Sequence, residues 1–238
     1  QDQNRNRYFS HFQTFYRLII MRVYLRIKAT DKIVPFNHQH FLTGTIYKWL
    51  GWNDEHGNLS LYSFSRLFGG KNSPEGLLFK NDASLFFSSY HPELIKKIIT
   101  GIKKDPTMFE GLIVNDIIIL EDPDLTTREC FYPGSPIFIK RRIDNNIVHI
   151  PYSDPRSSDF LLETLKSKME KAGLSDDSLE ISFLNNLSEA STKMVSYKGI
   201  NNRASWCPVM IKGKPETKVF AWNVGLGNST GIGFGAIK

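Results

Sequence analysis

The chain closes on a glycine-rich run, G-L-G-N-S-T-G-I-G-F-G, which places five of its 17 glycines between Gly225 and Gly235. Loops that cradle a nucleotide carry their glycines in front of a helix, because the first N–H groups of that helix point at the phosphate. Only three residues follow Gly235 and none of them is acidic, so we expect no dinucleotide site here. Residues without side chains would instead let a long polyanion approach successive backbone N–H groups.

Basic charge is concentrated in the same part of the chain. The segment from Lys193 to Lys238 contains seven lysines or arginines and one acidic residue, Glu216, so it carries the whole formal net charge of +6. A localised basic region of this kind is typical of nucleic-acid-binding proteins. A solvated basic surface without such a partner is the alternative.

The overall composition predicts an ordinary globular protein, with 41% hydrophobic and 23% charged residues. Cys130 and Cys207 lie far apart and in no C-x-x-C pattern. We therefore expect no disulfide framework, no metal site and a cytoplasmic location. No apolar run reaches the roughly 18 residues of a membrane span, so no membrane partner is expected.

The first 20 residues mix arginines with aromatic side chains and lack a small-residue cleavage site, so we predict no signal peptide. Two interpretations stay open. In the first, Met21 begins the natural chain and residues 1–20 are an upstream extension. In the second, residues 1–20 form a basic, aromatic arm that packs on the first strand.

From Met21 the sequence shows regular hydrophobic patterns. M-R-V-Y-L-R-I-K alternates apolar with mostly basic residues, which predicts a half-buried strand with a basic face. Helices are predicted from the H-Q-H block to a C-cap at Gly51, over 92–103 and over 159–172. Further strands are predicted at 59–64, 77–79, 84–88, 114–120, 137–141, 179–183, 193–197, 209–211 and 218–223.

A domain boundary is indicated by E-D-P-D-L-T-T at 121–127 and Y-P-G-S-P at 132–136. After it the order of strand, helix and strands begins again, although a second helix is clear only in the first half. The sequence therefore predicts an α+β protein with two tandem ferredoxin-like (β-α-β-β-α-β) domains. They would span 21–125 and 130–238, after an N-terminal extension over 1–20, and the second would end in the glycine-rich loop.

Several motifs taken together resemble one known family. They are M-R-V-Y-L-R-I-K, P-F-N-H-Q-H-F-L-T-G-T-I-Y-K-W-L, L-Y-S-F-S-R-L-F-G-G, S-P-I-F-I-K and the terminal glycine pattern. Over 21–238 the chain is similar to the CRISPR-associated endoribonuclease that processes the repeat transcript, the sixth in the numbered series of CRISPR-associated proteins and part of the RAMP superfamily. The resemblance implies tandem ferredoxin-like domains, binding of repeat RNA and one metal-independent cut per repeat, without a cofactor.

The implied chemistry needs groups that transfer protons. A 2′-OH attacks the neighbouring phosphate, so the site must hold a proton acceptor, a donor for the leaving 5′-oxygen and a stabiliser of phosphate charge. The products are a 2′,3′-cyclic phosphate and a 5′-OH. Histidine suits the proton transfers because its unperturbed pKa is about 6.5. By position, the resemblance assigns Tyr47 and His56 to catalysis, with His40 and His38 as further candidates and a structural role as the alternative for His38.

The chain departs from the family pattern after His56. Many members carry a lysine a few residues beyond the catalytic histidine, whereas H-G-N-L-S-L-Y-S-F contains none. The cation that stabilises the phosphate must then come from elsewhere. Candidates are Lys28, Lys32, Lys48 and Lys71, and for each of them a solvated surface lysine is the alternative.

RNA contacts are expected from basic groups that position the backbone and from the glycine-rich loop. The stretch V-M-I-K-G-K-P-E-T-K-V-F is interpreted as a hairpin that turns at 213–215. Tyr197, Trp206 and Trp222 are either platforms for unpaired bases or, as we favour, core residues. The predicted RNA-binding residues are Lys28, Lys48, Lys140, Arg141, Lys212, Lys214, Lys218, Gly225, Gly227, Gly231 and Gly233, and Arg142 could line the same groove.

A non-catalytic RNA-binding subunit of a CRISPR effector complex is the second hypothesis. The missing lysine supports it, while Tyr47 and the nearby histidines favour the enzyme. The expected partners are precursor repeat RNA, other CRISPR-associated effector subunits and a second copy of the chain.

Overall fold

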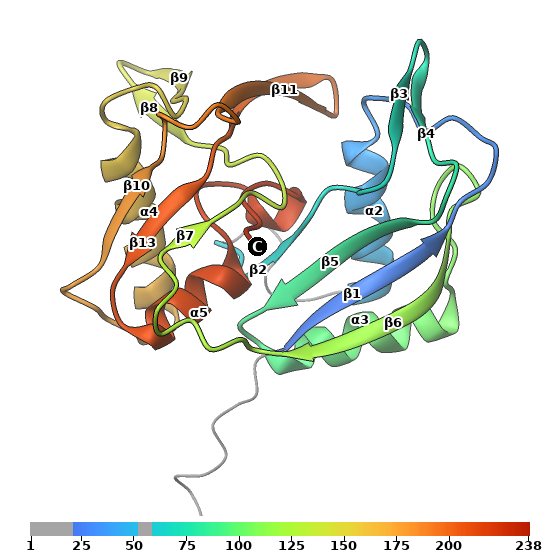
Figure 1. Cartoon of the computed structure of the whole chain (residues 1–238), viewed down its shortest axis with the longest axis horizontal. Coiled ribbons are helices and arrows are strands. Elements are labelled where there is room, and N and C mark those ends of the chain that lie inside the picture. Colours follow the sequence, from blue (N-terminus) through green and yellow to red (C-terminus); the bar gives the residue numbers. More distant parts are fainter. Residues whose placement is uncertain (1–20, 52–58) are drawn as a thin grey trace, which may run out of the picture.

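The computed structural model describes residues 21–51 and 59–238. Figure 1 shows two lobes side by side, with the end of the chain between them. The predictions for residues 1–20 and for His56 fall outside the described part of the chain.

The first lobe is an antiparallel sheet with helices on one face (Figure 1). Val23, Leu25 and Ile27 are fully buried, as the alternation in the first strand predicts. Within the described residues the strand order in the sheet is β2-β5-β1-β6. Along the chain, α2 follows β1 and α3 follows β5. This is the ferredoxin-like arrangement. Its elements are β1 (Met21–Lys28), α2 (Gln39–Leu50), β2 (Tyr62–Phe64), β5 (Ala83–Ser89), α3 (Pro92–Lys104) and β6 (Ile113–Glu121), with a small hairpin of β3 (Lys71–Ser73) and β4 (Gly76–Leu78).

The two helices of this lobe pack closely on each other. α3 begins with Pro92 in its first turn and buries a leucine and three isoleucines, as its periodicity predicts. α2 ends at Leu50, and Gly51 follows it as the predicted C-cap with a φ of 62°. Gly101 lies against the backbone of Trp49, and a Cβ at this position would overlap it.

The second lobe repeats the same topology. The order β10-β13-β7 is completed by the last residues, because Tyr132 and Lys238 exchange backbone hydrogen bonds of 2.9 and 2.8 Å beside β7. The prediction of two tandem ferredoxin-like units is confirmed. The elements are β7 (Cys130–Phe131), α4 (Ser157–Lys171), β10 (Glu180–Phe183), β13 (Val209–Lys212) and α5 (Pro215–Val224), with hairpins of β8 (Lys140–Ile143) and β9 (Asn146–His149), and of β11 (Ser191–Tyr197) and β12 (Ile200–Trp206).

The predicted strand at 218–223, and with it the hairpin turning at 213–215, is wrong. These residues form α5, the helix that was not clear in the second half. The aromatic and β-branched residues favour a strand locally. Pro215 starts the helix, however, and Phe220, Ala221 and Val224 pack into the second hydrophobic core. Tertiary packing therefore overrides the local propensity.

The first strand of the second half lies earlier than predicted. β7 occupies 130–131, inside the expected boundary region, whereas the expected strand at 137–141 is divided between an isolated bridge from Ile137 to Ser205 and the start of β8. Each lobe has its own hydrophobic core, although Leu61 and Tyr90 contribute to the second one. The limits of the two domains stay a prediction. Every helix in the described ranges is too short or too polar to cross a membrane.

Two helical glycines should respond to alanine with opposite signs. At Gly44 an added Cβ meets no atom within 4 Å, so Gly44→Ala should raise the free energy of unfolding by roughly 0.5–1 kcal/mol. Gly101→Ala should lower it by about 1–3 kcal/mol, because the methyl group would force α3 away from Trp49. Urea denaturation of both variants measures the difference. A stabilised Gly101→Ala variant would contradict the close packing of α2 on α3.

Candidate functional site

One face of α2 looks toward the glycine-rich loop. Gln39, Thr43 and Tyr47 are four residues apart and therefore line up along the helix. The Nε2 of Gln39 donates to the carbonyl oxygen of Ile232 at 2.8 Å. The Thr43 hydroxyl lies 2.9 Å from the Gln39 carbonyl oxygen and 3.2 Å from that of Ile232. Helix and loop are thus joined by side chains from the first half and carbonyl groups from the second.

Tyr47 lies at the end of this row and is half-buried. Burial raises the pKa of its phenol, nearby Tyr197 raises it further, and a hydrogen bond with Tyr62 lowers it. The Tyr62 hydroxyl in turn donates to the carbonyl oxygen of Gly231 at 3.3 Å. Tyr47 therefore stays neutral at physiological pH, and because the Tyr62 proton goes to Gly231, the Tyr47 hydroxyl donates its own proton to Tyr62.

His38 and His40 lie at the other end of α2. The Nδ1 of His38 donates to the Pro35 carbonyl at 2.7 Å, its ring stacks on Phe109, and burial lowers its pKa. The Nδ1 of His40 donates to the Asn37 carbonyl at 3.0 Å, which leaves Nε2 as the acceptor nitrogen of a neutral ring. Seven residues separate His40 from Tyr47, about 10 Å along the helix axis. The structure brings the two predicted residues to one helix but not into contact.

The glycine-rich loop is packed between the lobes. Gly225, Gly227, Gly231 and Gly233 are all buried, while Asn228 and Ser229 are half-buried. Gly233 has a φ of +88°, and a Cβ there would overlap the Gln39 amide and the Phe64 ring. The missing side chains let other parts of the protein approach the loop closely. Contact of these glycines with RNA stays a prediction.

Lys168 fixes this loop, a role that the sequence pattern does not predict. The residue lies on α4 and is 1% exposed. Its Nζ donates to the carbonyl oxygens of Val224 at 3.1 Å and Gly225 at 3.0 Å, and to the Thr230 hydroxyl at 3.3 Å. A lysine in an amphipathic helix is expected at the surface, so the sequence pattern does not indicate that Lys168 is buried.

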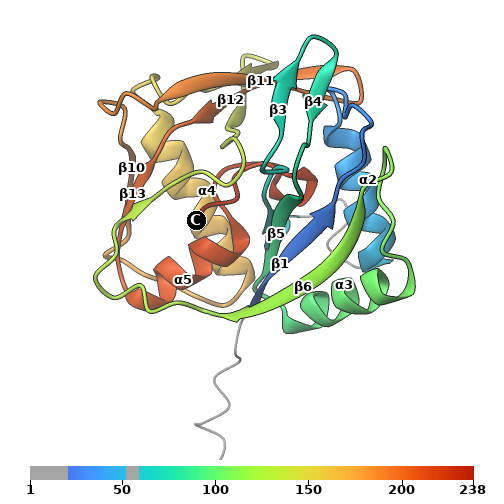
Figure 2. The ribbon, with the colours of Figure 1, turned by 45° about the vertical axis from the view of Figure 1, so that its right-hand side comes forward.

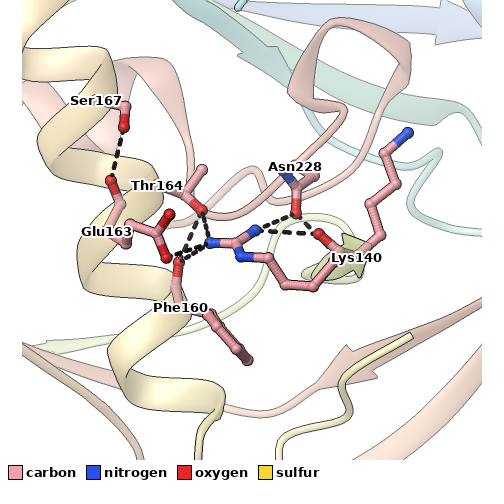
Figure 3. Close-up of polar contacts among 7 residues, drawn as sticks. Lys140, Phe160, Glu163, Thr164, Ser167 and Asn228 are labelled. Atoms are coloured by element: carbon pink, nitrogen blue, oxygen red, sulfur yellow. Dashed lines mark hydrogen bonds and ion pairs between the residues drawn. The ribbon is translucent and has the colours of Figure 1, made fainter. Parts of the chain in front are cut away.

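Several predicted RNA-binding side chains already have protein partners. Arg141 donates to the Phe160 carbonyl at 3.0 Å and to the Thr164 hydroxyl at 3.1 Å on α4, within the cluster shown in Figure 3. The amine of buried Lys218 donates to the Thr126 carbonyl at 2.8 Å. Lys48 pairs with Asp105 at 2.8 Å, and this contact, with help from Thr107, holds the pKa of the Asp105 carboxyl well below its usual range.

Other predicted basic residues remain at the surface. Lys28, Lys140 and Lys214 have exposed side chains. Lys212 is also exposed and lies 3.4 Å from the Glu180 carboxylate, a pair that solvent weakens. These residues are available to a polyanion in the structure, and their role in binding stays a prediction.

A cavity of about 640 Å³ lies where the two lobes meet. Arg22, predicted to lie on a solvent-facing basic strand face, is instead fully buried there. Its Nη2 donates to the carbonyl oxygens of Trp222 at 2.5 Å and Ile237 at 2.9 Å, and burial lowers its pKa to about 9. The cavity is lined by Arg22, Tyr24, Arg128, Tyr132, Pro133, Glu189, Trp206, Trp222 and Lys238.

Comparisons with known proteins agree with this fold. A family model described as CRISPR associated protein Cas6, C-terminal, matches residues 120–238. A CRISPR-associated endoribonuclease Cas6 of Pyrococcus furiosus is 24% identical over 238 residues, covering 92% of this chain and 89% of the relative. Two solved structures, of a Cas6-related gene product of Pyrococcus furiosus and of an RAMP protein that binds different RNA substrates, align with TM-scores of 0.80 and 0.77 at 23% and 22% identity. Each alignment covers 92% of this chain and 98% of the other.

Gly233 should tolerate alanine less well than another glycine of similar φ. Gly233→Ala should lower the free energy of unfolding by at least about 2 kcal/mol, because backbone strain adds to overlap with Gln39 and Phe64. Gly173, with a φ of +71° and no atom near its Cβ position, is the matched control and should cost only about 1 kcal/mol. Urea denaturation compares them. Equal losses would show that the loop is not tightly packed at Gly233.

Lys168 should make stability depend on pH. Burial lowers its pKa to about 7, from an ordinary value of 10.5. Between these values the unfolded chain binds more protons than the folded one, so the contribution of Lys168 to the free energy of unfolding rises with pH. Relative to Lys168→Met, wild type should gain about 1.4 kcal/mol per pH unit between pH 7.5 and 9.5 in urea titrations.

The control for this experiment is Lys166→Met, an exposed lysine on the same helix. Its difference from wild type should be equal at both pH values. A constant difference for Lys168→Met as well would show that the carbonyl groups of the loop keep the buried amine charged throughout.

Proposed function

Since the chain belongs to the Cas6 family of CRISPR-associated proteins, we propose that it binds CRISPR repeat RNA and cleaves the precursor transcript within each repeat without a metal ion. The observation that supports this most directly is the position of Tyr47. The residue stands where α2, β2, the glycine-rich loop and the β11–β12 hairpin meet. A relative of similar length carries the name of an endoribonuclease.

The proposed reaction is attack of a ribose 2′-OH on the adjacent phosphate. When RNA binds, the neutral phenol of Tyr47 exchanges its hydrogen bond to Tyr62 for one to a phosphate oxygen and stabilises the charge that develops there. Histidine transfers the protons: one ring accepts the proton of the 2′-OH, and a protonated ring returns one to the 5′-oxygen as the P–O bond breaks. His40, with Nε2 as an acceptor, and His56 are the candidates.

The cavity between the lobes supports an RNA path across the molecule. It combines arginine and lysine side chains with the rings of Tyr24, Tyr132 and Trp206. Arg66 adds a further cation 4.1 Å from the centre of the Trp206 ring. Cations that follow a phosphate backbone beside rings that stack on bases are the usual means of binding single-stranded RNA.

One observation favours the alternative of a non-catalytic RNA-binding subunit. Lys48, next to Tyr47 in the sequence, is held by Asp105 and by the carbonyl of Thr107 at 2.6 Å. It is therefore not aimed at a phosphate beside Tyr47. A binder would retain repeat RNA without cutting it.

Removal of two histidines should separate cutting from binding. The double variant His40→Ala with His56→Ala should lose all detectable cleavage of labelled repeat RNA in EDTA, since each proton-transfer group contributes about 10²–10⁴-fold. Its dissociation constant should stay within about twofold of wild type. The wild-type products should end in a 2′,3′-cyclic phosphate and a 5′-OH.

The control is His91→Ala, which removes a histidine in front of α3 and should leave cleavage unchanged. Undiminished cleavage by the double variant would overturn the assignment of the histidines. Tight binding by a wild-type protein that never cuts would favour the RNA-binding subunit.

A further inference from the structure

The glycine-rich loop lies between α4 of the second lobe and α2 of the first, as Figure 2 shows. Lys168 of α4 donates to the carbonyl oxygen of Gly225 where the loop begins. Gln39 of α2 donates to the carbonyl oxygen of Ile232 further along. Between these two contacts lies the tip of the loop, where half-buried Asn228 makes contacts of its own.

Asn228 fixes the tip to the segment that leads into β8. Its N–H donates to the carbonyl oxygen of Phe138 at 2.7 Å, and its Oδ1 accepts from the N–H of Lys140 at 2.9 Å. The preceding residue, Gly227, lies so close to the Phe138 carbonyl that a Cβ there would overlap it. One side chain and one glycine therefore hold the tip in close contact with this segment.

Arg141 joins the same asparagine to α4, within the cluster that Figure 3 shows. Its Nη1 donates to the Oδ1 of Asn228 at 3.3 Å. Its Nη2 donates to the Phe160 carbonyl at 3.0 Å and to the Thr164 hydroxyl at 3.1 Å, and the Glu163 carboxylate lies 3.2 Å from it. A guanidinium presents its N–H groups in a rigid fork, so this one side chain sets the distance between the helix and the tip of the loop.

A short turn connects the tip to α2. The 3-10 helix η1 (Thr230–Ile232) follows it directly, and the last N–H of this helix donates to the carbonyl oxygen three residues earlier at 3.1 Å. The Ile232 carbonyl oxygen then accepts from the Nε2 of Gln39 at 2.8 Å. Only residues 229–231 separate Asn228 from the residue that is bound to the helix of Tyr47.

Building on the proposed function, we propose that Arg141 and Asn228 are positioning residues of the cleavage site. They fix the tip of the loop relative to α4, and η1 and Gln39 connect the tip to α2, which carries Tyr47. The sequence predicts Arg141 as an RNA contact, whereas its guanidinium is engaged within the protein. A displacement of about 1 Å in such a site can reduce the rate 10²-fold, so this contact bears on turnover rather than on RNA affinity.

The first test removes the fork of Arg141 but keeps its charge. Arg141→Lys should lower the single-turnover rate on repeat RNA roughly 10-fold, because one ammonium group cannot bind α4 and Asn228 together. The dissociation constant should stay within about twofold of wild type. Asn228→Ala should lower the rate by a similar factor, and the double variant should be no slower than the slower single variant, because both changes break the same contact.

The matched controls are Arg156→Lys and Asn146→Ala, at two exposed positions of the same lobe. Both should cleave at the wild-type rate. Arg141→Ala separates positioning from RNA contact: its rate should fall at least as far as that of Arg141→Lys, while the dependence of RNA affinity on salt stays unchanged. An arginine bound to a phosphate would instead lower that dependence by about one phosphate when it is removed.

A second measurement does not depend on cleavage. Amide hydrogen exchange of residues 228–235 should be faster in Arg141→Lys and Asn228→Ala than in wild type, and unchanged in both controls. A wild-type protein that does not cut RNA would overturn the proposed function and with it the role of this contact in cleavage. The exchange result would then decide separately whether Arg141 and Asn228 hold the loop.

Three results would overturn the inference. The first is a wild-type rate together with wild-type exchange in Arg141→Lys. The second is a wild-type rate in Arg141→Ala with a weaker salt dependence of binding, and the third is additive losses of rate in the double variant. Comparison of the melting temperatures of the single variants with those of the two controls separates the expected loss of rate from general unfolding.

Discussion

The arrangement of the two lobes depends on the backbone carbonyl groups of the glycine-rich loop. Those of Val224 and Gly225 accept from Lys168 of the second lobe. Those of Gly231 and Ile232 accept from Tyr62 and Gln39 of the first. Leu226 and Phe234 of the loop pack into hydrophobic clusters, and donors on both sides fix the carbonyl groups between them. Because buried acceptors are costly to leave unpaired, the loop stabilises one relative position of the lobes, and with it the place where Tyr47 meets the second half.

Most regular elements could be predicted from the sequence, because their hydrophobic patterns are strong. α3 has leucine and isoleucine on one side and lysine on the other, and β1 alternates cleanly. α5 could not be predicted, since its aromatic and β-branched residues favour a strand and only contact with the second core makes it a helix. The short β7 lay unnoticed among proline and glycine because a two-residue strand has no period to detect.

The residues of the candidate site likewise include some that the sequence predicts and some that it does not. Tyr47 was identified from the G-T-I-Y motif, and the structure places it beside the loop that closes the chain. The burial of Lys168, Arg22 and Lys218 could not be seen in the sequence, because it depends on contacts between residues more than 50 positions apart. The sequence alone predicts that the glycines contact a polyanion. Gly233 instead leaves space for Gln39 and Phe64, and Gly231 for Ser60 and Tyr62, a requirement that a single sequence does not distinguish from close approach of a phosphate.

The structure also shows which basic residues of the charged segment are accessible. The segment from 193 to 238 carries the net charge of the chain, yet Lys218 is buried and Lys212 is near a carboxylate. Lys193, Lys198 and Arg203 all lie on the β11–β12 hairpin and are exposed. Three exposed cations of this segment therefore lie on the hairpin that reaches α2, while Lys212, Lys214 and Lys238 are exposed outside it. A polyanion attracted to this hairpin would meet the element that contacts α2, the helix on which Tyr47 lies.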